Sequence, residues 1–323
     1  MRLACLTCAF AFLAAGAAAA PALQLERTLP LSGGAGRIDH LAFDARRGRL
    51  VVAELGAGVV EAVDIATGKP AASVSGLKEP QGVAVLAERD EVAVASGGDG
   101  AVRFYRAADL APVAEVMLGE DADNLRVDPR NGTLVAGYGA GALAVIDPVR
   151  HVVLRRIALS AHPESFQLSG GRAYVNLPGA NRVVAVDLDS GRVAQVLGNP
   201  GALANFPLAL DPATGVAAAV YRLPARLVLF GAADGKVRQR LDTCGDSDDA
   251  FFDVPRHRLY VICGQGVVDT FGEGQAGYVR QDRMATAPGA RTGLYVAQLD
   301  RLFVAARAQG RDGPRILVLK PLP

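Results

Sequence analysis

Residues 162–197 read HPESFQLSGGRAYVNLPGANRVVAVDLDSGRVAQVL, and this stretch decides the fold. It contains four short apolar runs, Ser165–Leu168, Arg172–Asn176, Arg182–Val186 and Arg192–Leu197. Apolar and polar positions alternate within the runs, and Gly, Pro, Asn and Asp lie between them, which is typical of strands in an antiparallel meander. The stretch therefore predicts one four-stranded sheet.

The same unit recurs along the chain with a period of about 41 to 43 residues. In four copies an aspartate closes the first strand, and three degenerate copies carry another residue there: Asp44, Asp128, Asp211 and Asp253, then Leu86, Ser169 and Val296. A tight turn and three further strands follow each of these positions. Four strands per copy at this period are typical of a β-propeller blade, so seven copies predict an all-β, seven-bladed propeller.

The seventh copy ends at Pro323, just after its third strand. The segment LQLERTLPL, residues 23–31, alternates like a strand but belongs to no other copy. We expect it to pair with the last blade as its outer strand, which closes the ring and removes two open sheet edges. An open solenoid or a pair of sandwiches would leave this strand unexplained. The predicted blades are residues 37–76, 77–119, 120–160, 161–201, 202–243, 244–286, and 287–323 together with 23–33.

The first 22 residues have the composition of a secretory signal peptide. Arg2 is followed by the apolar run Leu3–Ala15 and by small residues that end in Ala20-Pro21-Ala22, so cleavage near Ala22 is expected. No later segment approaches the roughly 18 consecutive apolar residues of a membrane span. We expect a soluble monomer that is periplasmic or secreted.

Removal of that segment leaves two cysteines, Cys244 and Cys263. Cys244 lies in the loop that leads into blade six, and Cys263 lies at the end of the second strand of that blade. Because the two strands are antiparallel, both residues fall on the same face of the ring. In an oxidising compartment this placement favours a disulfide over two free thiols.

Charge and motifs restrict the function classes. The formal net charge is +1 and there is no long basic run, so nucleic-acid binding is not indicated. The sequence contains no G-x-S-x-G, no H-E-x-x-H and no cluster of several histidines. A binding or scaffold protein therefore ranks ahead of an enzyme.

Several stretches resemble a known family. Residues 174–197, YVNLPGANRVVAVDLDSGRVAQVL, resemble the YVTN-type propeller repeat. GRIDHLAFD (36–44), HPESFQL (162–168) and DDAFFDVPRHRLYV (248–261) are similar to exported bacterial YncE-like seven-bladed propellers. The resemblance extends from about Gly36 to Ala306, and it implies the fold and export but no particular activity.

In a propeller the first strand of each blade lines the central channel, and the loops that lead into these strands converge on one face. The positions five residues before each repeat anchor are mostly polar: Asp39, Gln81, Asp123, Glu164, Phe206, Asp248 and Arg291. Carboxylates that converge on an axis perturb one another, and perturbed groups in a concavity suggest a site. With neighbouring polar residues, the predicted ligand-binding set is Asp39, His40, Gln81, Asp123, Asn124, Glu164, Asn205, Asp248, Asp249 and Arg291.

Three interpretations of this polar ring remain open. It binds a small cationic or polyhydroxylated ligand, or a protein partner, at the channel mouth. It holds a hard cation such as Ca²⁺, the one cofactor that the residues suggest, because clustered carboxylate and amide oxygens suit that ion. Alternatively the polar side chains are structural, with Arg291 paired to Asp248 or Asp39. An enzyme would most plausibly be a metal-dependent hydrolase of the lactonase kind, which is an analogy of fold alone.

Overall fold

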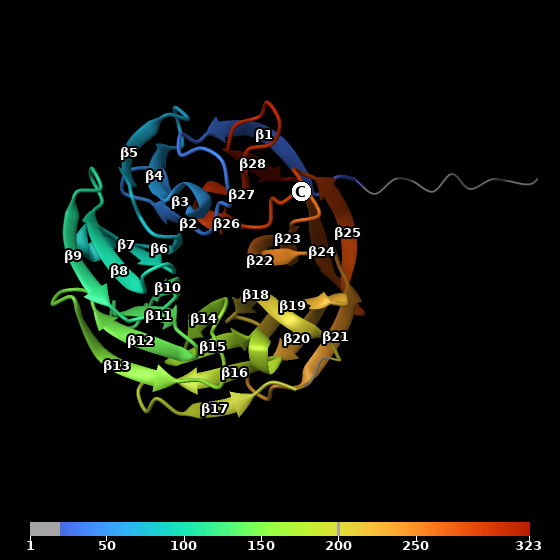
Figure 1. Ribbon diagram of the computed structural model, residues 1–323. Helices are drawn as coiled ribbons and strands as arrows, with labels where there is room; N and C mark the ends of the chain where they lie inside the picture. Colours follow the sequence, from blue (N-terminus) through green and yellow to red (C-terminus); the bar gives the residue numbers. More distant parts are fainter. Residues whose placement is uncertain (1–19, 199–200) are drawn as a thin grey trace, which may run out of the picture.

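The computed structural model describes residues 20–198 and 201–323, and the regular elements in these ranges are strands and short 3-10 turns. The strands form seven four-stranded antiparallel sheets, arranged as blades around a central channel (Figure 1). In six of them the strands follow chain order from the channel outward. The predicted seven-bladed β-propeller is confirmed.

The strands of blades one to three are β2 (Leu41–Asp44), β3 (Arg49–Glu54), β4 (Val59–Asp64) and β5 (Pro70–Ser75); β6 (Pro80–Leu86), β7 (Glu91–Ser96), β8 (Ala101–Arg106) and β9 (Pro112–Met117); β10 (Ala122–Val127), β11 (Leu134–Tyr138), β12 (Ala142–Asp147) and β13 (Val152–Ala158). Those of blades four and five are β14 (Phe166–Ser169), β15 (Arg172–Leu177), β16 (Arg182–Asp187) and β17 (Val193–Val196); β18 (Leu203–Asp211), β19 (Val216–Leu223), β20 (Ala225–Gly231) and β21 (Val237–Asp242).

Blade six consists of β22 (Ser247–Asp253), β23 (Arg258–Cys263), β24 (Val267–Gly274) and β25 (Gly277–Ala285), and blade seven of β26 (Gly293–Val296), β27 (Arg301–Ala306), β28 (Arg315–Pro321) and β1 (Leu23–Pro30). The 3-10 turns are η1 (Leu55–Ala57), η2 (Ala87–Arg89), η3 (Pro178–Ala180), η4 (Val254–Arg256) and η5 (Ala297–Leu299).

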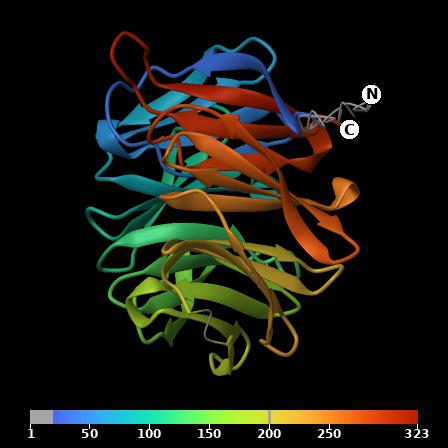
Figure 2. The same cartoon turned by 90° about the vertical axis from the view of Figure 1, so that its right-hand side faces the viewer.

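The N-terminal strand closes the ring. β1 pairs antiparallel with β28, from Leu23 opposite Pro321 to Pro30 opposite Arg315, so the order of the last sheet is β1-β28-β27-β26. Figures 1 and 2 both show β1, in blue, running along β28, in red. The closure expected from the unassigned strand at residues 23–31 is thus confirmed.

The apolar core lies between blades rather than within them. Each cluster of buried apolar side chains in the described residues is shared by two neighbouring blades. One cluster joins Phe104 of β8 to Leu134 of β11, and another joins Leu50 of β3 to Phe303 of β27. Because both faces of each blade are covered, its middle strands are buried on both sides and read as continuous apolar runs.

The aspartate that recurs at the end of the first strand has a structural role. Asp44 Oδ1 accepts hydrogen bonds from the backbone N–H of Arg46 and Arg47, and Asp128 Oδ1 accepts one from the backbone N–H of Arg130. These contacts cap the turn into the second strand on the face opposite the channel mouth. The repeat anchor is therefore scaffold.

The predicted signal peptide falls outside the described residues except for its last three positions. Of these, Ala22 is buried, its N–H donates to Asp282 Oδ2 at 2.8 Å, and its carbonyl accepts from the N–H of Leu322 at 2.9 Å. Within residues 20–198 and 201–323, the structure contains no helix with the length and apolar character needed to span a bilayer.

The predicted disulfide is confirmed. Cys244 and Cys263 are bonded, with their Cα atoms 5.8 Å apart and both side chains buried. The bond ties the loop that leads into β22 to the end of β23, and so fixes the position from which Asp246 and Asp248 reach the mouth.

Removing this crosslink should destabilise the propeller. The bond joins residues 19 positions apart, and a loop of that size corresponds to about 3 kcal/mol of unfolding free energy in the chain-entropy model. We expect the double variant Cys244→Ala/Cys263→Ala to lose about this amount in urea denaturation. The oxidised protein should contain no thiol that can be alkylated. The reduced wild type should have the same unfolding free energy as the variant. Equal stability of all three forms would contradict the prediction.

A second buried feature affects stability through pH. Glu54, at the end of β3, and Glu61, in β4, are 1% and 0% exposed. Neither Glu54 oxygen has a hydrogen-bond partner among the described residues, whereas Glu61 Oε2 accepts from the Ser32 N–H at 2.8 Å. Burial, and next the adjacent Glu61 charge, raise the pKa of Glu54 to about 8. Near neutral pH the Glu54 carboxyl group is therefore largely protonated.

This pair predicts a loss of stability with rising pH. A carboxyl whose pKa is raised on folding stabilises the protein fully below its unfolded pKa, and the contribution is lost as pH rises through the folded value. Relative to Glu54→Gln, wild type should lose on the order of 1 kcal/mol of unfolding free energy per pH unit between about pH 5 and pH 8. Urea denaturation at several pH values measures this. Glu88→Gln, which removes an exposed carboxylate elsewhere, is the control, and a pH-independent difference between wild type and Glu54→Gln would refute the assignment.

Candidate binding site at the channel mouth

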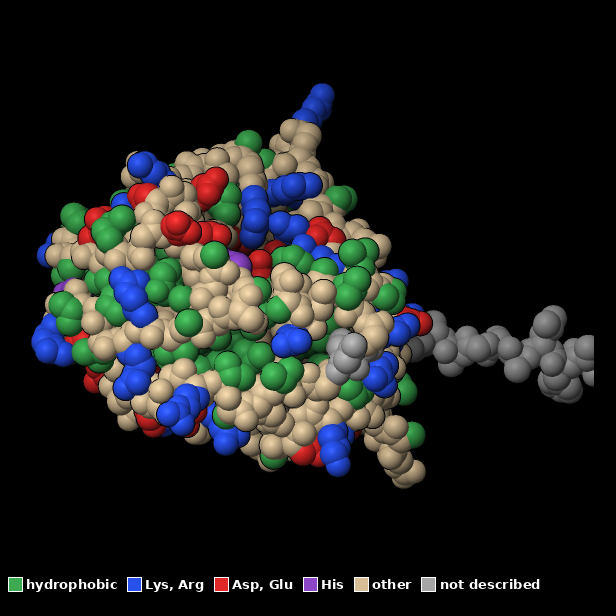
Figure 3. All heavy atoms as spheres, turned by 60° about the horizontal axis from the view of Figure 1, so that its bottom comes forward, with side chains coloured by type: hydrophobic (Ala, Val, Ile, Leu, Met, Phe, Trp, Pro, Cys, Tyr) green, Lys and Arg blue, Asp and Glu red, His purple; other side chains and the backbone are tan. Residues whose placement is uncertain are grey.

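The lead-in loops and first-strand ends converge on a polar cavity of about 180 Å³ at the channel mouth. Its lining is almost entirely charged or polar: Arg37, Gln81, Asp121, Asp123, His162, Glu164, Phe206, Arg222, Asp248 and Arg291. In Figure 3 acidic, basic and histidine side chains gather toward the middle of the upper face. Acidic and basic side chains this close together can pair with one another, so the question for ligand binding is which of them have no partner within the protein.

One side of the mouth is an arginine cluster around Asp248 of β22. Arg222 Nη2 donates to Asp248 Oδ1 at 2.8 Å, and Arg291 Nε lies 2.9 Å from Asp248 Oδ2. Arg291 Nη1 also donates to Asp246 Oδ1 at 3.0 Å, while Arg37 Nη2 lies 4.0 Å from Asp248. Burial, and next the charge of Asp39, raise the pKa of Asp248 to about 6 despite these cations. This side is internally neutralised.

Asp39 and His40, from the loop that leads into β2, are also paired. Asp39 is 1% exposed and accepts from Arg37 Nη2 at 3.0 and 3.2 Å. His40 Nδ1 lies 3.7 Å from Asp249 Oδ2, which also accepts from the Gly293 N–H. Burial by itself lowers the pKa of His40, but the Asp39 and Asp249 carboxylates outweigh burial and raise it to about 10. Asp39 and Asp249 are thus already neutralised, by Arg37 and His40 respectively.

The opposite side of the mouth contains Asp123 of β10 together with His162 and Glu164 from the loop that leads into β14. His162 Nδ1 lies 2.6 Å from the Gly139 carbonyl and 3.5 Å from Asp121, and Nε2 lies 3.6 Å from Asp123 Oδ2. Burial opposes the charged form of His162, but the nearby Asp123 carboxylate and the Gly139 carbonyl raise its pKa to about 9. His162 is therefore protonated at neutral pH: its Nδ1 donates to the Gly139 carbonyl, and its Nε2 faces Asp123 at ion-pair distance.

Glu164 differs from every other acid of the mouth. No hydrogen bond or ion pair links its carboxyl group to the described residues, although it lines the cavity. Burial, and next the charges of Asp123 and Asp248, raise its pKa to about 8. Near neutral pH Glu164 is thus a neutral carboxylic acid whose O–H and carbonyl both remain available to a ligand.

The structure separates the predicted residues into those that line the mouth, those that lie behind or below it, and those that line neither cavity. Gln81, Asp123, Glu164, Asp248 and Arg291 line the mouth. Asp39 lies behind it against Arg37, and His40 and Asp249 line a second cavity one tier deeper. Asn124 and Asn205 are buried and line neither cavity: Asn124 donates to Asp123, and Asn205 donates to Asn176 Oδ1 and the Arg182 carbonyl.

Five residues of the lining were not in the predicted ligand-binding set: Arg37, Asp121, His162, Phe206 and Arg222. Phe206 is a position of the ring but not a member of that set. Arg37, Asp121 and His162 lie two residues before a predicted position, from where their side chains still reach the axis. Arg222 lies near the end of β19, and its guanidinium stacks 3.6 Å from the Phe206 ring centre. The second strand of each blade ends on the mouth face, and this rule placed Cys263 on that face. The same rule, applied to β19, could have identified Arg222 as a residue of the mouth.

Three ligand atoms, one each from Asp123, His162 and Glu164, lie within 4.8 Å of one another, a separation that a metal ion could bridge. Asp39, His40 and Asp123 form a second such group. In the second group, however, Asp39 is paired with Arg37 and His40 with Asp249. An imidazole ligand suits Zn²⁺ or another transition metal better than Ca²⁺, which prefers oxygen ligands only.

No protein-family model matches the chain, and no curated protein sequence matches it significantly. Solved structures do match its shape. A chain of the hydrazine synthase of Kuenenia stuttgartiensis superposes with a TM-score of 0.74 at 17% identity, covering 83% of this chain and 92% of that one. A chain of the mitotic checkpoint complex superposes with a TM-score of 0.79 at 15% identity, covering 100% and 99%. Identities this low support the propeller fold alone.

Proposed function

We propose that the chain is an exported propeller of the YncE-like type, and that its channel mouth binds a small polyhydroxylated molecule. The observation that carries this proposal is the Glu164 carboxyl group, which lines the mouth without a partner among the described residues. The group is partly exposed at the mouth, so its oxygens are free to exchange solvent for the hydrogen-bonding groups of a ligand.

The chemistry of the mouth favours hydroxyl groups over a simple cation. Arg222 and Arg291 present N–H donors, whereas Asp123 presents acceptor oxygens, and a hydroxyl group can satisfy both kinds at once. A cationic ligand would meet three arginines and a protonated His162. The volume of about 180 Å³ corresponds to about six water molecules, which is the size of a small polyol or one edge of a sugar ring.

Variants of Glu164 separate a polyhydroxylated ligand from a cationic one. Because Glu164 is neutral near pH 7, Glu164→Gln should keep most of the affinity for a polyol or monosaccharide. Glu164→Leu should lose about tenfold or more, since it leaves ligand hydroxyls unpaired. Calorimetric titration with a series of polyols and monosaccharides measures this. Glu115→Leu on the outer strand β9 is the control.

Two outcomes would contradict the polyol proposal. One is unchanged polyol affinity in Glu164→Leu. The other is binding of a diamine that Glu164→Gln abolishes, because a cation requires the ionised carboxylate and the amide cannot replace it.

A second candidate function is a metal-dependent hydrolase, and the grouping of Asp123, His162 and Glu164 favours it. Three protein ligands that leave a fourth position for water are the arrangement of catalytic zinc sites. Such an ion would lower the pKa of its bound water and supply a nucleophile. In this function Asp123, His162 and Glu164 would hold the ion, and the mouth arginines would stabilise negative charge on the substrate.

Metal binding at this group should strengthen with pH. His162 and Glu164, with pKa values of about 9 and about 8, must lose protons before they can coordinate. Zn²⁺ affinity, measured by competition with a chromophoric chelator, should therefore rise between pH 6 and pH 9 and fall strongly in His162→Gln. The exposed His257→Gln is the matched control. Zinc uptake that is identical in His162→Gln and wild type would exclude this site.

A further inference from the structure

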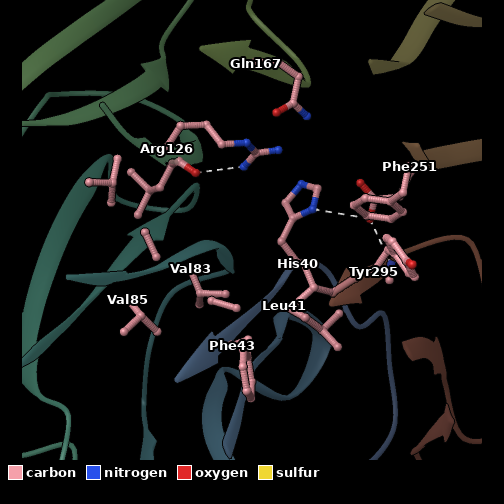
Figure 4. A pocket seen from close by; sticks show the side chains of 16 residues that line it. His40, Leu41, Phe43, Val83, Val85, Arg126, Gln167, Phe251 and Tyr295 are labelled. Carbon is pink, nitrogen blue, oxygen red and sulfur yellow. Dashed lines mark hydrogen bonds and ion pairs between the residues drawn. The ribbon is translucent and has the colours of Figure 1, made fainter. Parts of the chain in front are cut away.

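Below the mouth the channel widens into a second cavity of about 370 Å³, within the usual range for small-molecule sites. The first strands of blades one, two and three form most of its wall, and blades four, six and seven contribute the remainder. Figure 4 shows Arg126, Gln167 and His40 extending into the same space from different blades. Much of the remaining wall is apolar and includes Phe43, Val85 and Leu294.

Arg126 of β10 is the unusual residue of this cavity. Its Nη1 donates to the Leu125 carbonyl at 2.8 Å, and its Cζ lies 5.6 Å from the centre of the Phe166 ring. Among the described residues no carboxylate lies within ion-pair distance of its guanidinium, and burial lowers its pKa. By contrast, Arg37, Arg222 and Arg291 at the mouth each contact a carboxylate.

The cavity contains no acid left to neutralise Arg126. The carboxylate in its lining is Asp249, which is held by the Gly293 N–H at 2.9 Å and lies 3.7 Å from His40 Nδ1. Arg126 is partly exposed and faces the cavity, and a guanidinium that no carboxylate contacts there can gain a charge-assisted hydrogen bond from an added anion. The position therefore suits an anion that comes from outside the chain.

We propose that this deeper cavity binds a small apolar carboxylic acid, whose carboxylate pairs with Arg126. A guanidinium presents parallel N–H donors that match the two oxygens of a carboxylate. The apolar side chains along the first strands would cover the hydrocarbon part of the ligand and disfavour a fully polar anion such as phosphate. The inference does not depend on the ligand of the mouth, since Arg126 and Glu164 line different cavities.

The test compares acids with their neutral counterparts. Benzoate and hexanoate, each beside its amide, and inorganic phosphate are titrated against the full chain by calorimetry and by saturation-transfer NMR. The acids should bind at least about tenfold more tightly than the amides, as expected for a charge-assisted hydrogen bond, and phosphate should not compete. Arg126→Gln should lose that preference. Arg155→Gln, on the outer strand of the same blade, should bind the acids like wild type.

Several results would overturn the proposal. They are equal binding of acid and amide, unchanged binding in Arg126→Gln, phosphate binding as tight as that of hexanoate, and no binding of either acid at millimolar concentration. Thermal unfolding of Arg126→Met without ligand is a separate check. Removal of a charge that no carboxylate contacts should leave the melting temperature equal or higher, whereas a marked decrease would assign Arg126 a structural role instead.

Discussion

The pairing of β1 with β28 is the constraint on which the rest of the molecule depends. A blade buries neither of its faces alone, so each sheet needs a neighbour on both sides, and only a closed ring provides this for all seven. The cluster that contains Leu50 and Phe303 joins the first and last blades directly beside the closing strand. Ring closure forces the first strands to converge on one axis, and it therefore creates the channel.

Convergence has an electrostatic consequence. Side chains that would be solvated in separate loops are brought within a few ångströms of one another, so their charges must be balanced locally. On one side of the mouth Arg37, Arg222 and Arg291 achieve this balance around Asp248. On the other side Glu164 is neutralised by retaining its proton instead. The mouth is thus divided into a side whose charges are balanced by ion pairs and a side where a neutral carboxylic acid has no partner among the described residues.

Blade number, ring closure and the disulfide could be read from the sequence because each rests on local periodicity or on the direction of a strand. The individual site residues were harder to place. The first strands of blades two, three, five and six shift register near the mouth, for example between Asn205 and Leu208 in β18. A bulge interrupts the alternation of side-chain direction, so a fixed offset from the repeat anchor does not fix which way a residue faces. Asn124 and Asn205 consequently point into buried hydrogen bonds, while Arg222 reaches the mouth from a second strand.

Arg126 illustrates a different limit of sequence reading. It lies two residues before the repeat anchor Asp128, where the other copies carry the uncharged residues Ala42, Ala84, Gln167, Ala209, Phe251 and Leu294. The sequence thus marks Arg126 as unusual but does not show what surrounds it. Only the three-dimensional arrangement shows that its guanidinium enters a largely apolar channel where the nearby acid is already committed to His40. An apolar residue would fill this space without the cost of holding a charge that no carboxylate contacts. The Phe166 ring and the Leu125 carbonyl offset part of that cost, and pairing with a bound anion would offset more of it.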